Sequence, residues 1–184
     1  KPYDNAAFSK WRQLKKFWNK DKNEAGHYER KESIVITTEN VDEELKELKE
    51  CREELKNFSI KYLETLEKKY NLPFALLTME NEKNPTHTLR LLHYFDGAVA
   101  TAHCDTSILT CLYYRDEGLQ LKINNKWVPA PQLEKNQMLV TYGVPGEMLS
   151  DGNLKAARHR VKCNERYAVA YFHNTPKDFF FPAT

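Results

Sequence analysis

Between residues 41 and 70, apolar side chains recur at spacings of three, four and seven residues, and the positions between them are mainly Glu and Lys. Such spacing places the apolar side chains in one stripe along a helix. We expect a long amphipathic helix here, with Asn40 and Glu43 forming a capping box at its start and residues 71–73 ending it. The stripe would pack against a sheet rather than a coiled-coil partner, because it carries aromatic residues. Its members are Val41, Leu45, Leu48, Leu55, Phe58, Tyr62, Leu66 and Tyr70.

After Pro85 the pattern changes to short segments rich in β-branched and aromatic residues, with Gly, Asn, Asp and Pro between them. Short strands at this spacing are typical of an all-β sandwich or a jelly-roll barrel. The predicted strands are 33–38, 88–95, 98–103, 107–114, 119–123, 126–128, 138–142, 157–162 and 166–172. We also expect a short helix over 6–18 and a turn over 143–146. The predicted fold class is therefore mostly β with flanking helices.

The chain of 184 residues is long enough for one domain with a sizeable core. Since the helix stripe requires a surface to cover, we expect a single domain over 1–184. Residues 1–85 would form a helical and irregular support region, 86–176 a jelly-roll core and 177–184 a C-terminal tail. The first residue is Lys1 and not Met, which indicates a fragment or a processed form.

Composition and charge disfavour several classes of protein. Hydrophobic residues make up 41% and aromatic residues 12%, as in a folded globular chain and not a disordered one. The 28 basic and 26 acidic residues give a net charge of +2, which favours neither nucleic acid nor an anionic membrane as partner. No apolar run reaches the roughly 20 residues of a membrane span. The four cysteines are scattered without a CxxC pair, which favours reduced thiols in the cytoplasm.

His103 and Asp105 are the first candidates for chemistry. Residues i and i+2 of a strand point to the same face, so an imidazole and a carboxylate would project together and Cys104 would point away. A further histidine would complete the two-His-one-carboxylate face that binds non-haem iron. The candidate is His159, because a jelly roll brings strands that are far apart in sequence into opposed sheets. Arg166, seven residues later, would be costly to bury without an anion, and a bidentate carboxylate is its natural partner.

Further blocks surround these residues in a fixed order. They are Leu-Leu-His-Tyr-Phe at 91–95, Leu-Thr at 109–110, Gly-Leu-Gln-Leu at 118–121, Trp-Val-Pro at 127–129, Tyr-Gly at 142–143, Leu-Ser-Asp-Gly at 149–152 and His-Arg-Val at 159–161. With His103 and Asp105, the stretch 89–176 resembles the catalytic core of the iron(II)/2-oxoglutarate-dependent dioxygenases, in the branch that contains isopenicillin N synthase and the plant flavonoid oxygenases. Leu-Lys-Lys-Phe-Trp at 14–18 also resembles a segment that precedes this core.

The resemblance implies a double-stranded β-helix, a cupin-like jelly roll, buttressed by the long helix. It implies that His103, Asp105 and His159 hold Fe(II), and that Arg166 binds the distal carboxylate of 2-oxoglutarate. The implied activity is that of an oxygenase. Dioxygen and 2-oxoglutarate are consumed, succinate is formed, and a small organic substrate is hydroxylated or otherwise oxidised.

Two departures from the family pattern affect this reading. The family places a Ser two residues after the Arg, where this chain has Ala168. One neutral hydrogen bond to the 2-oxoglutarate carboxylate would be lost, with a net effect of about 1 kcal/mol on its binding. Tyr94 or His93 could supply a compensating donor. The front of the chain is also short, although family members carry strands of the substrate pocket there.

Two alternatives stay open. An oxidase like isopenicillin N synthase would keep the iron ligands, use no 2-oxoglutarate and turn Arg166 toward a carboxylate of its substrate. A catalytically silent jelly-roll binding module would retain the metal-binding face without activity. Arg166 could also have a purely structural role, paired with Glu165 or Asp151.

Overall fold

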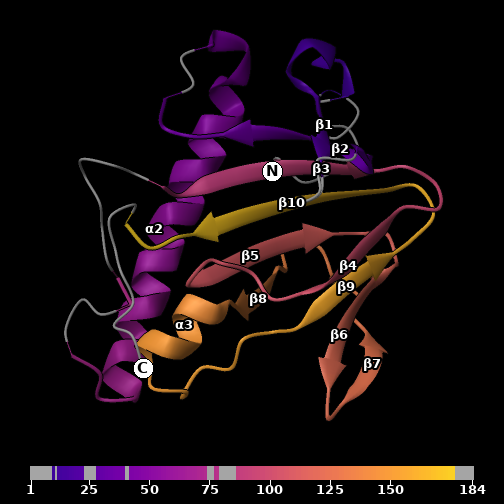
Figure 1. Ribbon diagram of the computed structural model, residues 1–184. Coiled ribbons are helices and arrows are strands. Elements are labelled where there is room, and N and C mark those ends of the chain that lie inside the picture. Colours follow the sequence, from indigo (N-terminus) through magenta and orange to yellow (C-terminus); the bar gives the residue numbers. More distant parts are fainter. Residues whose placement is uncertain are drawn as a thin grey trace.

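The computed structural model describes residues 10, 12–22, 28–39, 42–73, 77–78 and 86–176. Two antiparallel sheets form a jelly roll, and one long helix packs on the larger sheet (Figure 1). The larger sheet has the strand order β1-β2-β3-β10-β5-β8, and the smaller has the order β4-β9-β6-β7. The predicted fold class, a mostly β jelly roll buttressed by a long helix, is confirmed. The elements are η1 (Lys15–Phe17), β1 (Asn19–Lys22), β2 (Tyr28–Ile36), η2 (Glu43–Leu45), α2 (Lys46–Lys69), β3 (Thr88–Tyr94), β4 (Val99–His103), β5 (Leu109–Tyr114), β6 (Leu119–Ile123), β7 (Lys126–Pro129), β8 (Leu139–Tyr142), α3 (Val144–Leu149), β9 (His159–Lys162) and β10 (Arg166–His173).

The start of the long helix differs from the expected capping box. The 3-10 turn η2 precedes α2, and the Asp42 side chain accepts a hydrogen bond from the Glu44 amide at 3.0 Å. The expected capping residue, Asn40, lies outside the described residues. Among the described segments, no helix has the length and apolar character that crossing a membrane requires.

The buried face of α2 includes small side chains that an apolar stripe does not reveal. Ser59 is fully buried, donates a hydrogen bond to the Leu55 carbonyl at 2.8 Å and lies 3.7 Å from the Cys111 sulfur of β5. Phe58, a member of the predicted stripe, is 39% exposed instead. Close packing between helix and sheet favours the small residue at this position.

The predicted strands between 88 and 172 correspond to β3 through β10, with ends that differ by a few residues. Two elements have no counterpart in the sequence prediction. Strand β1 reads Asn-Lys-Asp-Lys and therefore carries no apolar alternation. Helix α3 replaces the turn expected over 143–146, because Pro145 fits the first turn of a helix. Gly146 is needed for packing, since an added Cβ would lie 2.3 Å from the Ile108 carbonyl oxygen.

Side-chain alternation gives the larger sheet two different faces. In β3, β5 and β10, odd-numbered residues such as Leu91 and Val169 belong to the core cluster that includes α2. Even-numbered residues of these strands, such as Leu92 and Ala168, belong to a second cluster, with residues of the smaller sheet. The functional residues predicted from the sequence can therefore meet between the sheets only if they occupy the second face.

Candidate active site

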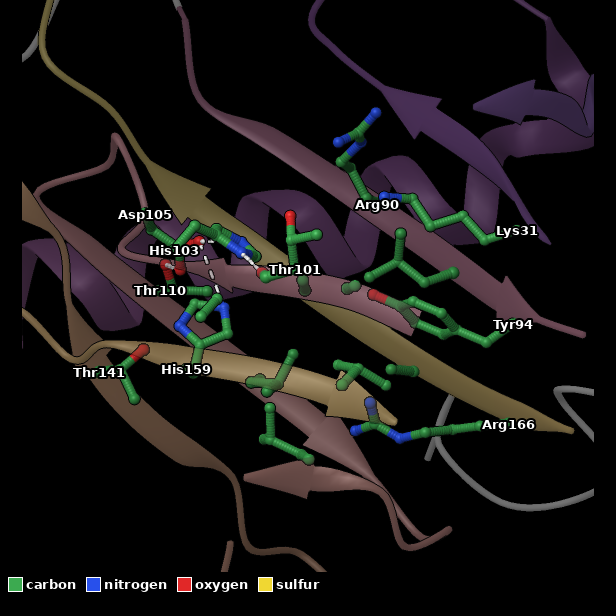
Figure 2. A pocket seen from close by; sticks show the side chains of 18 of the residues that line it. Lys31, Arg90, Tyr94, Thr101, His103, Asp105, Thr110, Thr141, His159 and Arg166 are labelled. Carbon is green, nitrogen blue, oxygen red and sulfur yellow. Dashed lines mark hydrogen bonds and ion pairs between the residues drawn. The ribbon is translucent and has the colours of Figure 1, made fainter. Parts of the chain in front are cut away.

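His103, Asp105 and His159 come together at one end of the space between the sheets (Figure 2). His103 ends β4 and His159 begins β9, and the two are direct partners in this antiparallel pair. Asp105 Oδ1 lies 3.8 Å from His103 Nε2 and 3.7 Å from His159 Nε2. One donor atom from each residue lies within 4.8 Å of the others, so the three donors can share one metal ion.

Contacts on the far side of each imidazole aim the histidine donors into the site. His103 Nδ1 lies 2.7 Å from the Thr101 carbonyl oxygen, and His159 Nδ1 lies 3.0 Å from the Ala157 carbonyl oxygen. Carbonyl oxygens accept hydrogen bonds, so each Nδ1 carries a proton, and Nε2 is the nitrogen that can offer a lone pair to a metal. This tautomer is the one that a metal requires of an Nε2 ligand.

The loop that carries Asp105 is held from both sides. Thr110 donates a hydrogen bond to Asp105 Oδ2 at 2.6 Å, and the Ser107 hydroxyl lies 2.8 Å from that of Thr110. On the backbone side, the Val144 amide donates to the Asp105 carbonyl at 2.9 Å, and a Cβ added to Gly143 would lie 2.4 Å from that oxygen. Asp105 therefore reaches the imidazoles through loop packing, and not by alternation along a single strand as the sequence predicts.

A cavity of about 1050 Å³ extends from these three residues between the sheets. Even-numbered residues of β3, β5 and β10 line it, and the strand register orders them in rows. Thr110 and Phe172 form the row beside Asp105, and the row of Ala170 comes next. Arg166 and Tyr94 form a row two further along, at the other end of the cavity (Figure 2). The cavity thus has a candidate metal centre at one end and a guanidinium at the other.

Arg166 is buried, and no carboxylate among the described residues forms an ion pair with it. It is 1% exposed, and its Nε and Nη2 atoms have no hydrogen-bond partner in the described part of the chain. Its guanidinium carbon lies 5.1 Å from the ring centre of Tyr114 and 5.7 Å from that of Tyr94. Burial lowers the pKa of Arg166, but a guanidinium stays protonated. Among the described residues, no ion pair joins it to Glu165 or Asp151, so an anion from outside the chain would stabilise it.

The two candidate donors beside Arg166 lie on opposite faces of β3. Tyr94 is the cross-strand partner of Arg166 and lines the cavity, and burial raises the pKa of its hydroxyl, which keeps the phenol neutral. The ring nitrogens of His93 lie 2.9 Å from Glu32 and 3.1 Å from Glu165, away from the cavity. The expectation that His93 could bind co-substrate is therefore corrected, because adjacent strand residues point to opposite faces.

Because position 168 is Ala, the cavity face of β10 carries no hydroxyl beside Arg166. Ala168 is fully buried, with Leu92 and Tyr114 as its partners on either side. The Tyr114 hydroxyl is engaged, because it donates to the Pro131 carbonyl at 2.7 Å. A carboxylate bound to Arg166 could thus take its second donor from Tyr94, the cross-strand partner of Arg166.

The sequence prediction missed several polar residues of the cavity wall, namely Lys31, Arg90, Thr101 and Thr141 (Figure 2). The sequence did contain a signal for one of these residues, Arg90. Arg90 precedes Tyr94 by four residues on the same strand, and the period of two places both on one face.

Comparison with known proteins gives one family. The profile of the 2OG-Fe(II) oxygenase superfamily matches residues 76–175. The chain is 38% identical to Protein SRG1 of Arabidopsis thaliana over 79 residues, which is 40% of this chain and 22% of that protein. It is 35% identical to 1-aminocyclopropane-1-carboxylate oxidase 1 of Arabidopsis thaliana over 81 residues, which is 41% of this chain and 26% of that protein. The chain thus matches about a quarter of the length of each of these relatives.

Among solved structures, the crystal structure of JOX2 in complex with 2OG, Fe and JA superposes with a TM-score of 0.78. The match covers 95% of this chain and 64% of that chain, at 19% sequence identity. A putative oxygenase from Shewanella oneidensis has a TM-score of 0.70, with 92% of this chain and 76% of that chain covered at 20% identity. At these identities the likeness establishes a shared fold.

Proposed function

This chain belongs to the 2OG-Fe(II) oxygenase superfamily, and we propose that it acts as an Fe(II)- and 2-oxoglutarate-dependent oxygenase on a small organic substrate. One observation carries the proposal. A three-donor metal face and a buried, unpartnered Arg166 lie at opposite ends of one cavity. This is the arrangement needed to hold a molecule that chelates a metal at one end and presents a carboxylate at the other.

His103, Asp105 and His159 would hold the ferrous ion, and their donor set fits it. Two neutral imidazoles and one carboxylate form the triad of non-haem Fe(II) oxygenases, which leaves the remaining positions open. A bound Fe(II) ion would supply the oxidising chemistry, in which dioxygen converts 2-oxoglutarate to succinate and carbon dioxide and delivers one oxygen atom to the substrate.

The protein residues bind, orient and exclude water. Arg166 would take the distal carboxylate of 2-oxoglutarate through its free N–H groups, and Tyr94 would donate a further hydrogen bond. The apolar side chains of Leu92 and Ala168 between the two ends would keep water from the bound co-substrate. The oxidase without 2-oxoglutarate is less well supported, because the matching family is the 2OG-Fe(II) oxygenase superfamily and the structural neighbour JOX2 is in complex with 2OG and Fe.

We further propose that the enzyme acts in the cytoplasm, with neither nucleic acid nor membrane as partner. The net charge of +2 provides no electrostatic attraction for polyanions. Cys104, Cys111 and Cys163 form no disulfide, as expected for a chain in a reducing compartment.

The test is anaerobic titration of the purified protein with Fe(II), with and without 2-oxoglutarate. We expect a visible metal-to-ligand charge-transfer absorption only when both are present. Asp105→Ala should remove iron binding, whereas Arg166→Gln should keep iron binding and weaken 2-oxoglutarate binding by roughly 10- to 150-fold, the loss expected for hydrogen bonds to a charged group. Bound iron without this absorption in the wild-type protein would favour the oxidase. Absence of iron binding would favour the silent binding module.

A further inference from the structure

We infer that Arg90 binds a carboxylate of the primary substrate. Only the description of this ligand as the substrate rests on the proposed function. Arg90 lies on the cavity face of β3, four residues before Tyr94, and lines the cavity (Figure 2). Like Arg166 it is an arginine of the cavity wall, and by strand register it lies two rows nearer the metal centre than Arg166 does.

The register of the strands sets the distance between Arg90 and the metal centre. Arg90 pairs with Ala170 on β10, and Ala170 pairs with Leu112 on β5. Neighbouring strands lie about 4.8 Å apart, so the backbones of Arg90 and Leu112 lie about 10 Å apart. Thr110, which binds Asp105, is two residues from Leu112 along β5. A molecule that reaches from the metal centre to Arg90 is therefore the size of an ordinary small metabolite.

The guanidinium of Arg90 has unused hydrogen-bonding capacity. Its Nε atom is buried without a hydrogen-bond partner, and its Nη2 atom lies 4.0 Å from Asp21 Oδ1, at the limit of an ion pair. Asp21 also accepts a hydrogen bond from the Ser33 hydroxyl at 2.7 Å and does not line the cavity. Asp21 therefore lies behind Arg90 and orients it, while the side of Arg90 toward the cavity stays available for a ligand.

Lys31, another cation of the cavity wall, is already paired. Its Nζ lies 2.6 Å from Glu29 and 3.5 Å from Asp21. Glu29 and Asp21 are thus engaged by Lys31, whereas the buried Nε of Arg90 has no hydrogen-bond partner among the described residues. A planar guanidinium with free donors binds a carboxylate in preference to a neutral oxygen.

The wall between Arg90 and the metal centre describes the rest of the ligand. Leu112, Ala170 and Phe172 line this part of the cavity and are apolar. The substrate class is therefore a small carboxylic acid with an apolar body, held by its carboxylate at Arg90 so that the body extends toward the metal ligands.

The experiment compares small acids with their primary amides, which have nearly the same shape and no charge. The probes are hexanoate, phenylacetate and cyclohexylacetate against hexanamide, phenylacetamide and cyclohexylacetamide. Dissociation constants are measured by equilibrium dialysis on the wild-type protein with Fe(II) and 2-oxoglutarate under argon. The same series is measured on metal-free Arg166→Gln protein, in which residue 166 cannot capture the acid. This second series uses neither iron nor 2-oxoglutarate, so it separates the present inference from the proposed function.

We expect at least one acid to bind tenfold or more tightly than its amide, and Arg90→Gln to weaken that acid roughly 10- to 100-fold while leaving its amide unchanged. Arg90→Lys keeps the charge without the planar guanidinium, so its affinity for the acid should lie between those of the wild type and Arg90→Gln. It also provides a second test if Arg90→Gln does not fold. Arg115→Gln is the matched control, since Arg115 is exposed at the end of β5 and does not line the cavity.

Three results would overturn the inference: no probe binds, amides bind as well as acids, or Arg90→Gln and Arg115→Gln have equal effects. If the acid preference persists while the charge-transfer absorption never forms, the Arg90 site stands and the oxygenase proposal falls.

Discussion

The hydrogen bond from Thr110 to Asp105 should decide how tightly the metal is held. Thr110 is 2% exposed, and its hydroxyl donates to Asp105 Oδ2 at 2.6 Å, which leaves Oδ1 facing the imidazoles. Val has nearly the same shape as Thr, so Thr110→Val removes the hydroxyl with little change in packing. The carboxylate then loses the contact that keeps Oδ2 turned away from the metal.

The size of the effect follows from the charge on the acceptor. A hydrogen bond to a charged group contributes about 1.5–3 kcal/mol. That corresponds to roughly 10- to 150-fold in a dissociation constant, and comparable losses are typical when a partner of a metal ligand is removed. Ser107→Ala, which removes only the hydroxyl 2.8 Å from that of Thr110, should weaken metal binding by a smaller factor.

The assay is anaerobic competition for Fe(II) between the protein and a chromophoric chelator, with thermal unfolding as the check on folding. Thr65→Val is the matched control, because Thr65 is exposed on α2 and its hydroxyl donates only to the Lys61 carbonyl of the same helix. Wild-type iron affinity in a folded Thr110→Val protein would refute the view that this hydrogen bond positions Asp105.

Three further predictions concern single side chains. Gly143→Ala should lower the free energy of unfolding by about 1–3 kcal/mol and weaken iron binding, because the added Cβ lies 2.4 Å from the Asp105 carbonyl oxygen; urea unfolding and iron titration measure both. Ala168→Ser should tighten 2-oxoglutarate binding about fivefold by restoring one neutral hydrogen bond beside Arg166, and unchanged affinity in a titration would show that the hydroxyl does not reach the carboxylate. Burial, helped by His87 and Lys56, lowers the pKa of His173 from 6.5 to about 3. Unfolding therefore takes up a proton between these pH values, so this contribution to stability is full above about pH 6.5 and declines as the pH falls toward 3. His173→Phe should flatten that decline in urea unfolding measured from pH 7 to pH 4, and an unaltered slope would assign it to other groups.

The strands and the clustering of the three candidate ligands could be predicted because each leaves a local pattern. Alternation and turn residues locate β3 through β10, and the spacing of His103, Asp105 and His159 within a series of family blocks singles out the three residues that the structure brings together. The position of Asp105 in a loop could not be predicted, since it depends on Gly143 and Val144, which lie far along the chain.

The residues of the cavity wall show where a local pattern is sufficient and where it is not. Once Tyr94 is assigned to the cavity, alternation alone excludes His93 and includes Arg90. The partners of these residues are a different matter. That Asp21 lies behind Arg90 depends on β1, a strand without any apolar residue. Pairing of such a strand is decided by its neighbours in the sheet, and hydrophobic periodicity carries no information about it.

The candidate metal ligands belong to the smaller sheet and the loop beside it, whereas Arg166 and Tyr94 belong to the larger sheet. A molecule bound at both ends of the cavity would therefore bridge the two layers. Loading the cavity should stiffen the whole barrel and raise its melting temperature in proportion to the logarithm of ligand concentration.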